Sequence, residues 1–154
     1  MKKLKKALAL VFILTISTAL AACGGSSSKE IDAQALANEL MEKVEFVDEL
    51  SPVKSEMVPK LYGIDNALEA YVYMGSGATA EEVAVFKFAS EQDAMDALAK
   101  IEQYIAARKD SFANYIPGEV ARLDNAVIRQ SGEYLALCVS EGSTASEIIS
   151  RYMA

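Results

Sequence analysis

Histidine is absent from this sequence of 154 residues. Its absence removes the usual general base, the commonest metal ligand, and the partner that activates serine and cysteine nucleophiles. An enzyme without histidine could still work with carboxylates alone, but the sequence carries no paired signature of that kind. We therefore expect a protein that is not an enzyme and has no catalytic residues and no metal site.

Cysteine is scarce, because Cys23 and Cys138 are the only two. If Cys23 is acylated, as the next observations indicate, no disulfide is possible and the core alone must hold the fold. Cys138 ends the apolar run Leu135–Leu137. Because a free cysteine is among the most buried residue types, we expect a buried, unreactive side chain in a central strand; a reactive thiol is the alternative.

The first 23 residues resemble the signal of a bacterial lipoprotein. Basic residues come first, an apolar run from Ala7 to Ala22 follows, and Leu20-Ala21-Ala22-Cys23 matches the lipobox. In a lipobox the cysteine thiol receives diacylglycerol and a peptidase cuts just before it. The basic residues are four lysines: Lys2, Lys3, Lys5 and Lys6.

Two other interpretations of this segment are weaker. A transmembrane helix needs about 20 apolar residues, more than this run supplies. An ordinary signal peptide would need no cysteine at this position. We therefore expect residues 1–22 to be a lipoprotein signal peptide, with cleavage between Ala22 and Cys23 and with diacylglycerol attached to Cys23.

Basic residues are few after the signal. Loss of residues 1–22 removes four of the 15 basic residues and none of the 22 acidic ones, which leaves a net charge of −11. Nucleic acid binding needs a basic surface, so we expect no nucleic acid partner. Anionic lipid would repel the domain, and we expect the diacylglycerol, the only attached group, to provide the membrane anchor. Neutral or positively charged partners are favoured.

The remaining chain predicts a short linker and one domain. Residues 23–30 comprise the lipidated cysteine and a flexible Gly/Ser-rich linker, and residues 31–154 are long enough for a single core. Hydrophobic periodicity predicts helices over about 33–46, 90–112 and from 144 onward, and β-hairpins over 68–88 and 126–140. We expect an α+β fold in the order α-ββ-α-ββ-α, with a four-stranded, mainly antiparallel sheet and three main helices.

Tyr71, Tyr73 and Tyr134 are the candidate binding residues. Strand alternation places them opposite the aliphatic side chains, on a face that three helices packed on one side would leave open. Tyrosine combines a large apolar area with a hydroxyl group that tolerates water. We expect a partner to dock on this face; packing in the core is the alternative.

Glu81 and Glu82 precede the apolar part of the second predicted strand. Neighbours on a strand point to opposite faces, so the two carboxylates should not converge on one metal ion. We expect both to lie at a solvated strand entrance.

Similarity to known proteins lies in the strand and turn segments 80–87, 125–127 and 132–140, together with Tyr115 and Pro117. These residues resemble a family of small lipoproteins of Gram-positive bacteria, known as domain of unknown function 4358. The resemblance implies attachment to the outer face of the plasma membrane and implies no known activity or functional residues. It covers about residues 31–153.

Three classes of function remain open. A tethered binding or interaction module, acting on a protein or a small molecule at the cell surface, fits the size of the domain and its lack of catalytic residues. A substrate-binding or transport-accessory lipoprotein usually closes two lobes around its ligand and needs a longer chain. An enzyme that uses only carboxylates is the third class.

Overall fold

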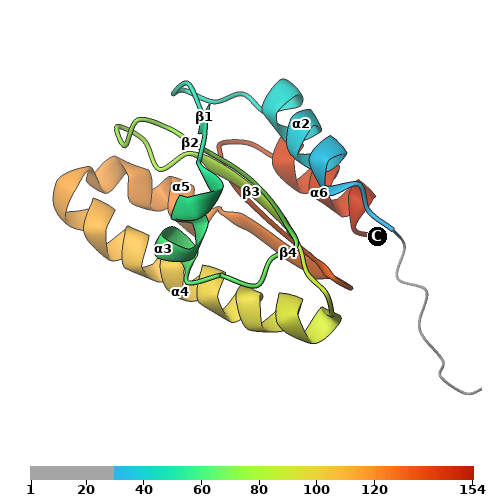
Figure 1. The fold of residues 1–154 in the computed structure, drawn as a ribbon. Coiled ribbons are helices and arrows are strands. Elements are labelled where there is room, and N and C mark those ends of the chain that lie inside the picture. The colour runs from blue at the N-terminus through green and yellow to red at the C-terminus, as the bar shows by residue number, and fades with distance from the viewer. Residues whose placement is uncertain (1–29) are drawn as a thin grey trace, which may run out of the picture.

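The computed structural model describes residues 30–154. The predicted signal peptide, the cleavage site at Ala22 and Cys23, and all of the linker except Glu30 therefore lie outside the described residues. The fold class is confirmed, because this part of the chain forms a single α+β domain (Figure 1).

One antiparallel sheet of five strands lies at the centre, in the order β1-β2-β3-β5-β4. The two predicted hairpins are β2–β3 and β4–β5, and β3 pairs with β5 to join them. The strands are β1 (Ser51–Pro52), β2 (Glu69–Met74), β3 (Glu82–Lys87), β4 (Val127–Ser131) and β5 (Tyr134–Val139).

The expectation of four strands and three main helices is wrong in both counts. The fifth strand, β1, pairs only Ser51 with Met74 and Pro52 with Tyr73, and two residues are too few to give an alternating pattern. Five α-helices and two 3₁₀ turns are described: α2 (Ala33–Lys43), α3 (Val58–Tyr62), α4 (Glu91–Tyr115), α5 (Val120–Asp124), α6 (Thr144–Tyr152), and turns at Ser55–Met57 and Pro117–Glu119.

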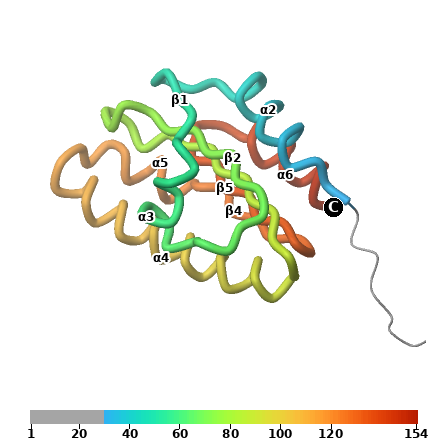
Figure 2. The backbone as a smooth tube through the Cα atoms, in the orientation of Figure 1, coloured from blue at the N-terminus to red at the C-terminus, as the bar shows by residue number. Residues whose placement is uncertain are grey.

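Helices cover both faces of the sheet, which makes three layers (Figures 1 and 2). The core on one side joins α3, α4 and α5 to residues such as Phe86 and Leu137. The core on the other side joins α2 and α6 to residues such as Val85 and Cys138. Consequently no face of the central strands is left open, contrary to the expectation from the sequence.

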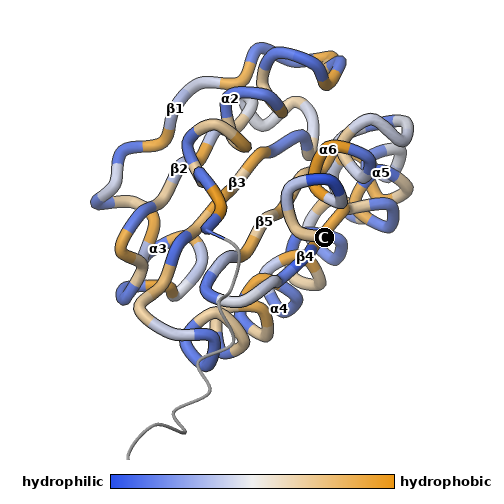
Figure 3. Tube along the Cα trace, turned by 90° about the vertical axis from the view of Figure 1, so that its right-hand side faces the viewer, coloured by the Kyte–Doolittle hydropathy of each residue, from blue (hydrophilic) through white to orange (hydrophobic). Residues whose placement is uncertain are grey.

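The central strands have the composition that this double cover requires. A strand buried on both faces reads as a continuous apolar run. In β3 the run Val83–Phe86 is completely buried, and all six residues of β5 are buried. Figure 3 shows the corresponding hydrophobic stretches in the middle of the molecule.

Local signals set the helix ends. Asp32 accepts a hydrogen bond from the Ala35 N–H at 2.8 Å at the start of α2, and Ser90 accepts one from the Asp93 N–H at 3.2 Å at the start of α4, as expected for N-caps. α2 ends at Lys43, three residues before the predicted end, because Val44 is extended. The N–H groups of Val47 and Asp48 bind a side chain instead of continuing the helix.

The two ends of the sheet carry different parts of the chain. At one end, which we call the tether end, Glu30 lies beside Glu69 and Lys87, around a common hollow. At the other end, the loop end, β3 begins at Glu82 and β5 finishes at Val139, and these two residues are paired. The described chain thus starts at the tether end, and the irregular segments before β3 and after β5 lie at the loop end.

Candidate functional site

Two adjacent acidic residues, Glu81 and Glu82, are buried at the loop end. Their exposed fractions are 1% and 0%, so the expected solvated strand entrance is wrong. Their carboxylates bind separate sets of residues, as strand alternation predicts. A buried carboxylate is costly unless it is paired and hydrogen-bonded, so each one needs its own partners.

Glu82 binds three side chains in the layer of α3 and α4. The Tyr62 hydroxyl donates to one carboxylate oxygen, and the Tyr104 hydroxyl donates to the other at 2.8 Å. The Arg108 guanidinium forms an ion pair with the same carboxylate. These contacts join β3 to two helices across the core.

Burial also shifts the titration of this group. Desolvation raises the pKa of Glu82 above its usual value, although Arg108 and the two tyrosines oppose the shift. Desolvation and the nearby Glu82 charge raise the pKa of Tyr62 and of Tyr104. Tyr62 is almost fully buried and its ring packs edge-on against Phe86 and Tyr104. We assign the Glu82 cluster a structural role, because Tyr62, Tyr104 and Arg108 all donate to the buried Glu82 carboxylate.

Glu81 faces the other way and fixes the segment that follows α2. Its carboxylate accepts hydrogen bonds from the N–H groups of Val47, at 2.9 and 3.0 Å, and Asp48, at 2.8 Å, and from the Thr79 hydroxyl at 3.1 Å. Asp48 in turn accepts from the N–H and the hydroxyl of Ser76, both at 2.7 Å. The chain after α2 is therefore fastened to the loop between β2 and β3.

Arg122 is a positively charged residue that lies among three glutamates at the loop end. It projects from α5, and its side chain is only 8% exposed. One terminal nitrogen, Nη1, binds Glu119, and the other, Nη2, donates to Glu141 at 2.7 Å. The remaining nitrogen, Nε, lies 3.8 Å from a Glu81 oxygen. Burial opposes the charged form, but the hydrogen bonds to Glu141 and Glu119 raise the pKa of Arg122.

The Nε atom of Arg122 has an unusual environment. Within residues 30–154 it is the one buried side-chain nitrogen or oxygen without a hydrogen-bond partner. Leaving such a donor unpaired costs roughly 1–3 kcal/mol. The three carboxylates around Arg122 therefore do not use its full donor capacity.

Two clefts share lining residues at the loop end, and Arg122 lines the first of them. The first, which we call the Arg122 cleft, has a volume of about 620 Å³; the second, of about 580 Å³, extends toward α2. Glu141 and Gly142 line both clefts, and Glu81 lines the second one. The Arg122 cleft is mainly polar and is lined by small residues besides Arg122 and Glu141, namely Gly118, Ala121, Asn125, Val127, Ser140, Gly142 and Ser146.

The three candidate tyrosines do not form an open surface. Tyr134 is 2% exposed and belongs to the core beneath α2 and α6, while Tyr71 and Tyr73 are half-buried against the same core. The open face expected for them does not exist, because α2 and α6 cover it. Any contact of a partner with Tyr71 or Tyr73 is restricted to the edge of the sheet near β1.

Cys138 is a free cysteine and is completely buried. Its Sγ atom lies 3.7 Å from the Ser140 hydroxyl, and burial raises the pKa of the thiol to about 12. The predicted burial in a central strand is thus confirmed.

Two further features are absent from residues 30–154. No group of three or more histidine, cysteine or acidic residues has the arrangement of a metal site. No helix among these residues has the length and apolar character that a membrane crossing would need.

The family model for a domain of unknown function, DUF4358, matches residues 42–140. The chain belongs to this family. The matched range contains Glu81, Glu82, Arg108 and Arg122, whereas Glu141 follows directly after it. Comparison with curated proteins and with solved structures found no match.

Neither Arg122 nor its ion pairs were predicted from the sequence. Glu81, Glu119 and Glu141 are far apart along the chain, and only the fold brings them to one guanidinium. One signal was present: two glutamates lead directly into the apolar run of β3, which is a costly place for a charge unless partners are supplied.

Proposed function

We propose that this DUF4358 protein is a lipoprotein of the bacterial surface, anchored through Cys23 to the outer face of the plasma membrane, and that its domain is a non-catalytic binding module. The lipobox and the short apolar run support the anchor. The Arg122 cleft supports binding, because it is a polar hollow with a buried, incompletely paired cation in its wall.

The position of the cleft is compatible with this arrangement. The described chain begins at the tether end, whereas Glu81, Ser140 and Glu141 belong to the loop end. A lipid on Cys23 would hold the tether end near the membrane and leave the Arg122 cleft open to the outside. A small-molecule ligand fits the size of the cleft, since ligand pockets usually measure about 300–1,000 Å³.

The anchor is tested by replacing the acylated residue. We expect Cys23→Ala to abolish incorporation of labelled fatty acid and to block lipoprotein-type cleavage, so that the precursor accumulates or another peptidase releases the protein. The measurements are lipid labelling and the mass of the N-terminal fragment in intact cells. Lipid-labelled protein of mature size in the variant would disprove the anchor.

Binding is tested separately by thermal unfolding of the full chain in detergent with a panel of sugars, amino acids, peptides and metal ions. A ligand that binds the folded state raises the unfolding temperature as its concentration increases. If no compound shifts unfolding and crosslinking in intact cells yields no attached molecule, the binding function is refuted.

A further inference from the structure

We propose that the Arg122 cleft binds a zwitterionic ligand, a free amino acid or a short peptide, through its carboxylate and its ammonium group. This inference rests on the proposed binding function and names the class of ligand. It is drawn from the Nε atom of Arg122, which has no hydrogen-bond partner, and from the exposure of the Glu141 side chain.

The guanidinium of Arg122 has one edge that is only partly occupied. Nε and Nη2 donate in parallel directions from the same edge, which matches the two oxygens of a carboxylate. In the structure Nη2 binds one oxygen of Glu141 at 2.7 Å, whereas Nε has no hydrogen-bond partner. The Glu81 oxygen, at 3.8 Å, is too distant to serve as one. On this edge Nε is therefore a buried donor without an acceptor.

Glu141 is the replaceable partner of Arg122. Its side chain is 73% exposed, whereas Glu81 and Glu119 are largely buried and also accept hydrogen bonds from backbone N–H groups. An exposed ion pair contributes little stability, so moving Glu141 away has a small cost. A ligand carboxylate that takes its place on Nη2 and also reaches Nε would satisfy the buried donor.

Charge decides between an anion and a zwitterion. Three carboxylates surround one guanidinium at this site, and the whole chain has 22 acidic against 15 basic residues. A simple anion is therefore repelled at long range. A zwitterion carries no net charge, and its ammonium group provides a new partner for the Glu141 carboxylate after that carboxylate leaves Arg122.

The remaining lining fits the polar end of such a ligand. Ser140 and Ser146 contribute hydroxyl groups to the Arg122 cleft. The first turn of α6 also borders it, and no side chain caps that helix, because the Ser143 hydroxyl donates to Glu147 instead. Uncapped N–H groups at a helix N-terminus favour a carboxylate. Gly142 leaves open space next to this turn.

The experiment measures the affinity of the full chain, purified in detergent, by calorimetric titration. The probes are alanine and dialanine, their N-acetyl derivatives, which lack the ammonium group, and their amides, which lack the carboxylate. We expect the zwitterions to bind and each derivative to bind about tenfold more weakly or worse, the loss expected for one charged hydrogen bond. Equal affinity for zwitterions and amides would overturn the role of Arg122.

Two variants separate the roles of the two side chains. Arg122→Lys keeps the charge but loses the parallel donors, and should weaken zwitterion binding about tenfold or more. Glu141→Gln should weaken zwitterion binding while leaving the N-acetyl derivative at least as tightly bound, because the internal competitor for Arg122 is gone. Glu102→Gln removes the same charge from an exposed position of α4 outside the cleft and is the matched control, with unchanged affinity expected.

The outcomes distinguish this inference from the proposed function. If the zwitterions fail to bind but a sugar or another compound of the panel does, the ligand class is wrong and the binding function stands. If Arg122→Lys fails to fold, the result with the exposed Glu141→Gln variant decides, and an unchanged preference for zwitterions over N-acetyl derivatives in that variant contradicts the proposal.

Discussion

The thiol of Cys138 lies on β5 beneath α2 and α6, where water cannot stabilise a thiolate. Burial raises its pKa from 9.0 to about 12. Because the thiolate is the reactive form, the folded protein should be inert toward thiol reagents near neutral pH. The same residue in the unfolded chain would titrate in the ordinary range.

This difference makes a prediction about stability at high pH. Since folding favours the neutral thiol, the contribution of Cys138 is complete below pH 9 and is lost as the pH rises from 9 toward about 12. The free energy of unfolding of the wild type should therefore fall relative to that of Cys138→Ala over this range. Denaturant unfolding of both proteins measures the difference, and the comparison cancels the titration of the tyrosines.

A constant difference between the two proteins across this pH range would contradict the prediction. Rapid stoichiometric labelling of the folded protein at pH 8 would do so as well, because it would show an accessible thiolate.

At the scale of secondary structure elements, Glu82 connects β3 with α3 and α4 through Tyr62, Tyr104 and Arg108. Removing one member of a buried ion pair leaves the other charge without compensation and typically costs about 3–5 kcal/mol. The Arg108 side chain is 15% exposed, so water can recover part of that loss. We therefore expect Glu82→Gln to lower the free energy of unfolding by about 3 kcal/mol.

The matched control for Glu82→Gln is Glu42→Gln, which removes the same charge from an exposed pair with Lys43. Exposed pairs contribute about 0–1 kcal/mol, so this variant should unfold nearly as the wild type does. Equilibrium denaturation of the two variants is the measurement. Equal stability of both would show that the Glu82 cluster does not hold α3 and α4 to the sheet.

The elements that could be predicted are those with signals in their own residues. Helices α2 and α4 begin next to Asp32 and Ser90, which cap them, close to the predicted starts, and both predicted hairpins form. The second layer of helices was not predicted, although the continuous apolar run Val83–Phe86 is typical of a strand covered on both faces. The alternation in β2, a strand nearer the edge of the sheet, instead favours a sheet covered on one face.

The candidate site could not be predicted because it depends on segments that are distant in the sequence. Glu81 precedes β3, Arg122 lies on α5, and Glu141 follows β5. Each of them alone reads as an ordinary charged residue near a strand or helix end. Their mutual distances follow from the pairing of β3 with β5 and from the position of α5, and neither relation leaves a local pattern.

On the scale of the whole molecule, the sheet separates the tether end from the loop end. The six residues of β3 span the distance between them in five steps, which corresponds to roughly 17 Å at about 3.3 Å per step. If Cys23 carries the lipid, a probe at the tether end should on average lie closer to the bilayer than one at the loop end. Glu91, at the start of α4, and Glu49, beside the segment bound by Glu81, are exposed positions for such probes.

We therefore predict an order of quenching for the lipidated full chain in vesicles that contain a headgroup quencher. A fluorophore attached to Glu91→Cys should be quenched more strongly than one attached to Glu49→Cys, while buried Cys138 remains unlabelled. Equal quenching at the two positions would indicate free tumbling, and the reverse order would mean that the Arg122 cleft faces the membrane.

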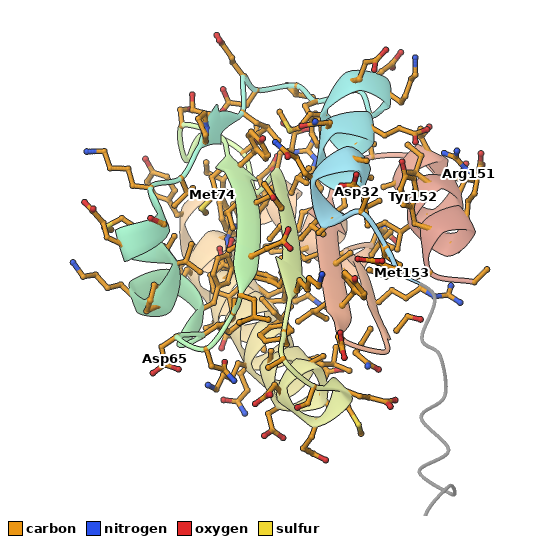
Figure 4. All side chains as sticks on the ribbon, turned by 45° about the vertical axis from the view of Figure 1, so that its right-hand side comes forward. Asp32, Asp65, Met74, Arg151, Tyr152 and Met153 are labelled. Carbon is orange, nitrogen blue, oxygen red and sulfur yellow. The ribbon has the colours of Figure 1, made fainter. Side chains whose placement is uncertain are left out.

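The described chain begins and ends on the same side of the molecule. Asp32, near its start, lies beside Arg151 and Tyr152, near its end, around a common hollow (Figure 4). An anchor transferred from the N-terminus to a short extension after Ala154 would therefore present the same surface to the medium. Joining residue 30 to residue 154 with a short linker and reopening the chain in the loop at Gly77 would give a circular permutant with the original sheet.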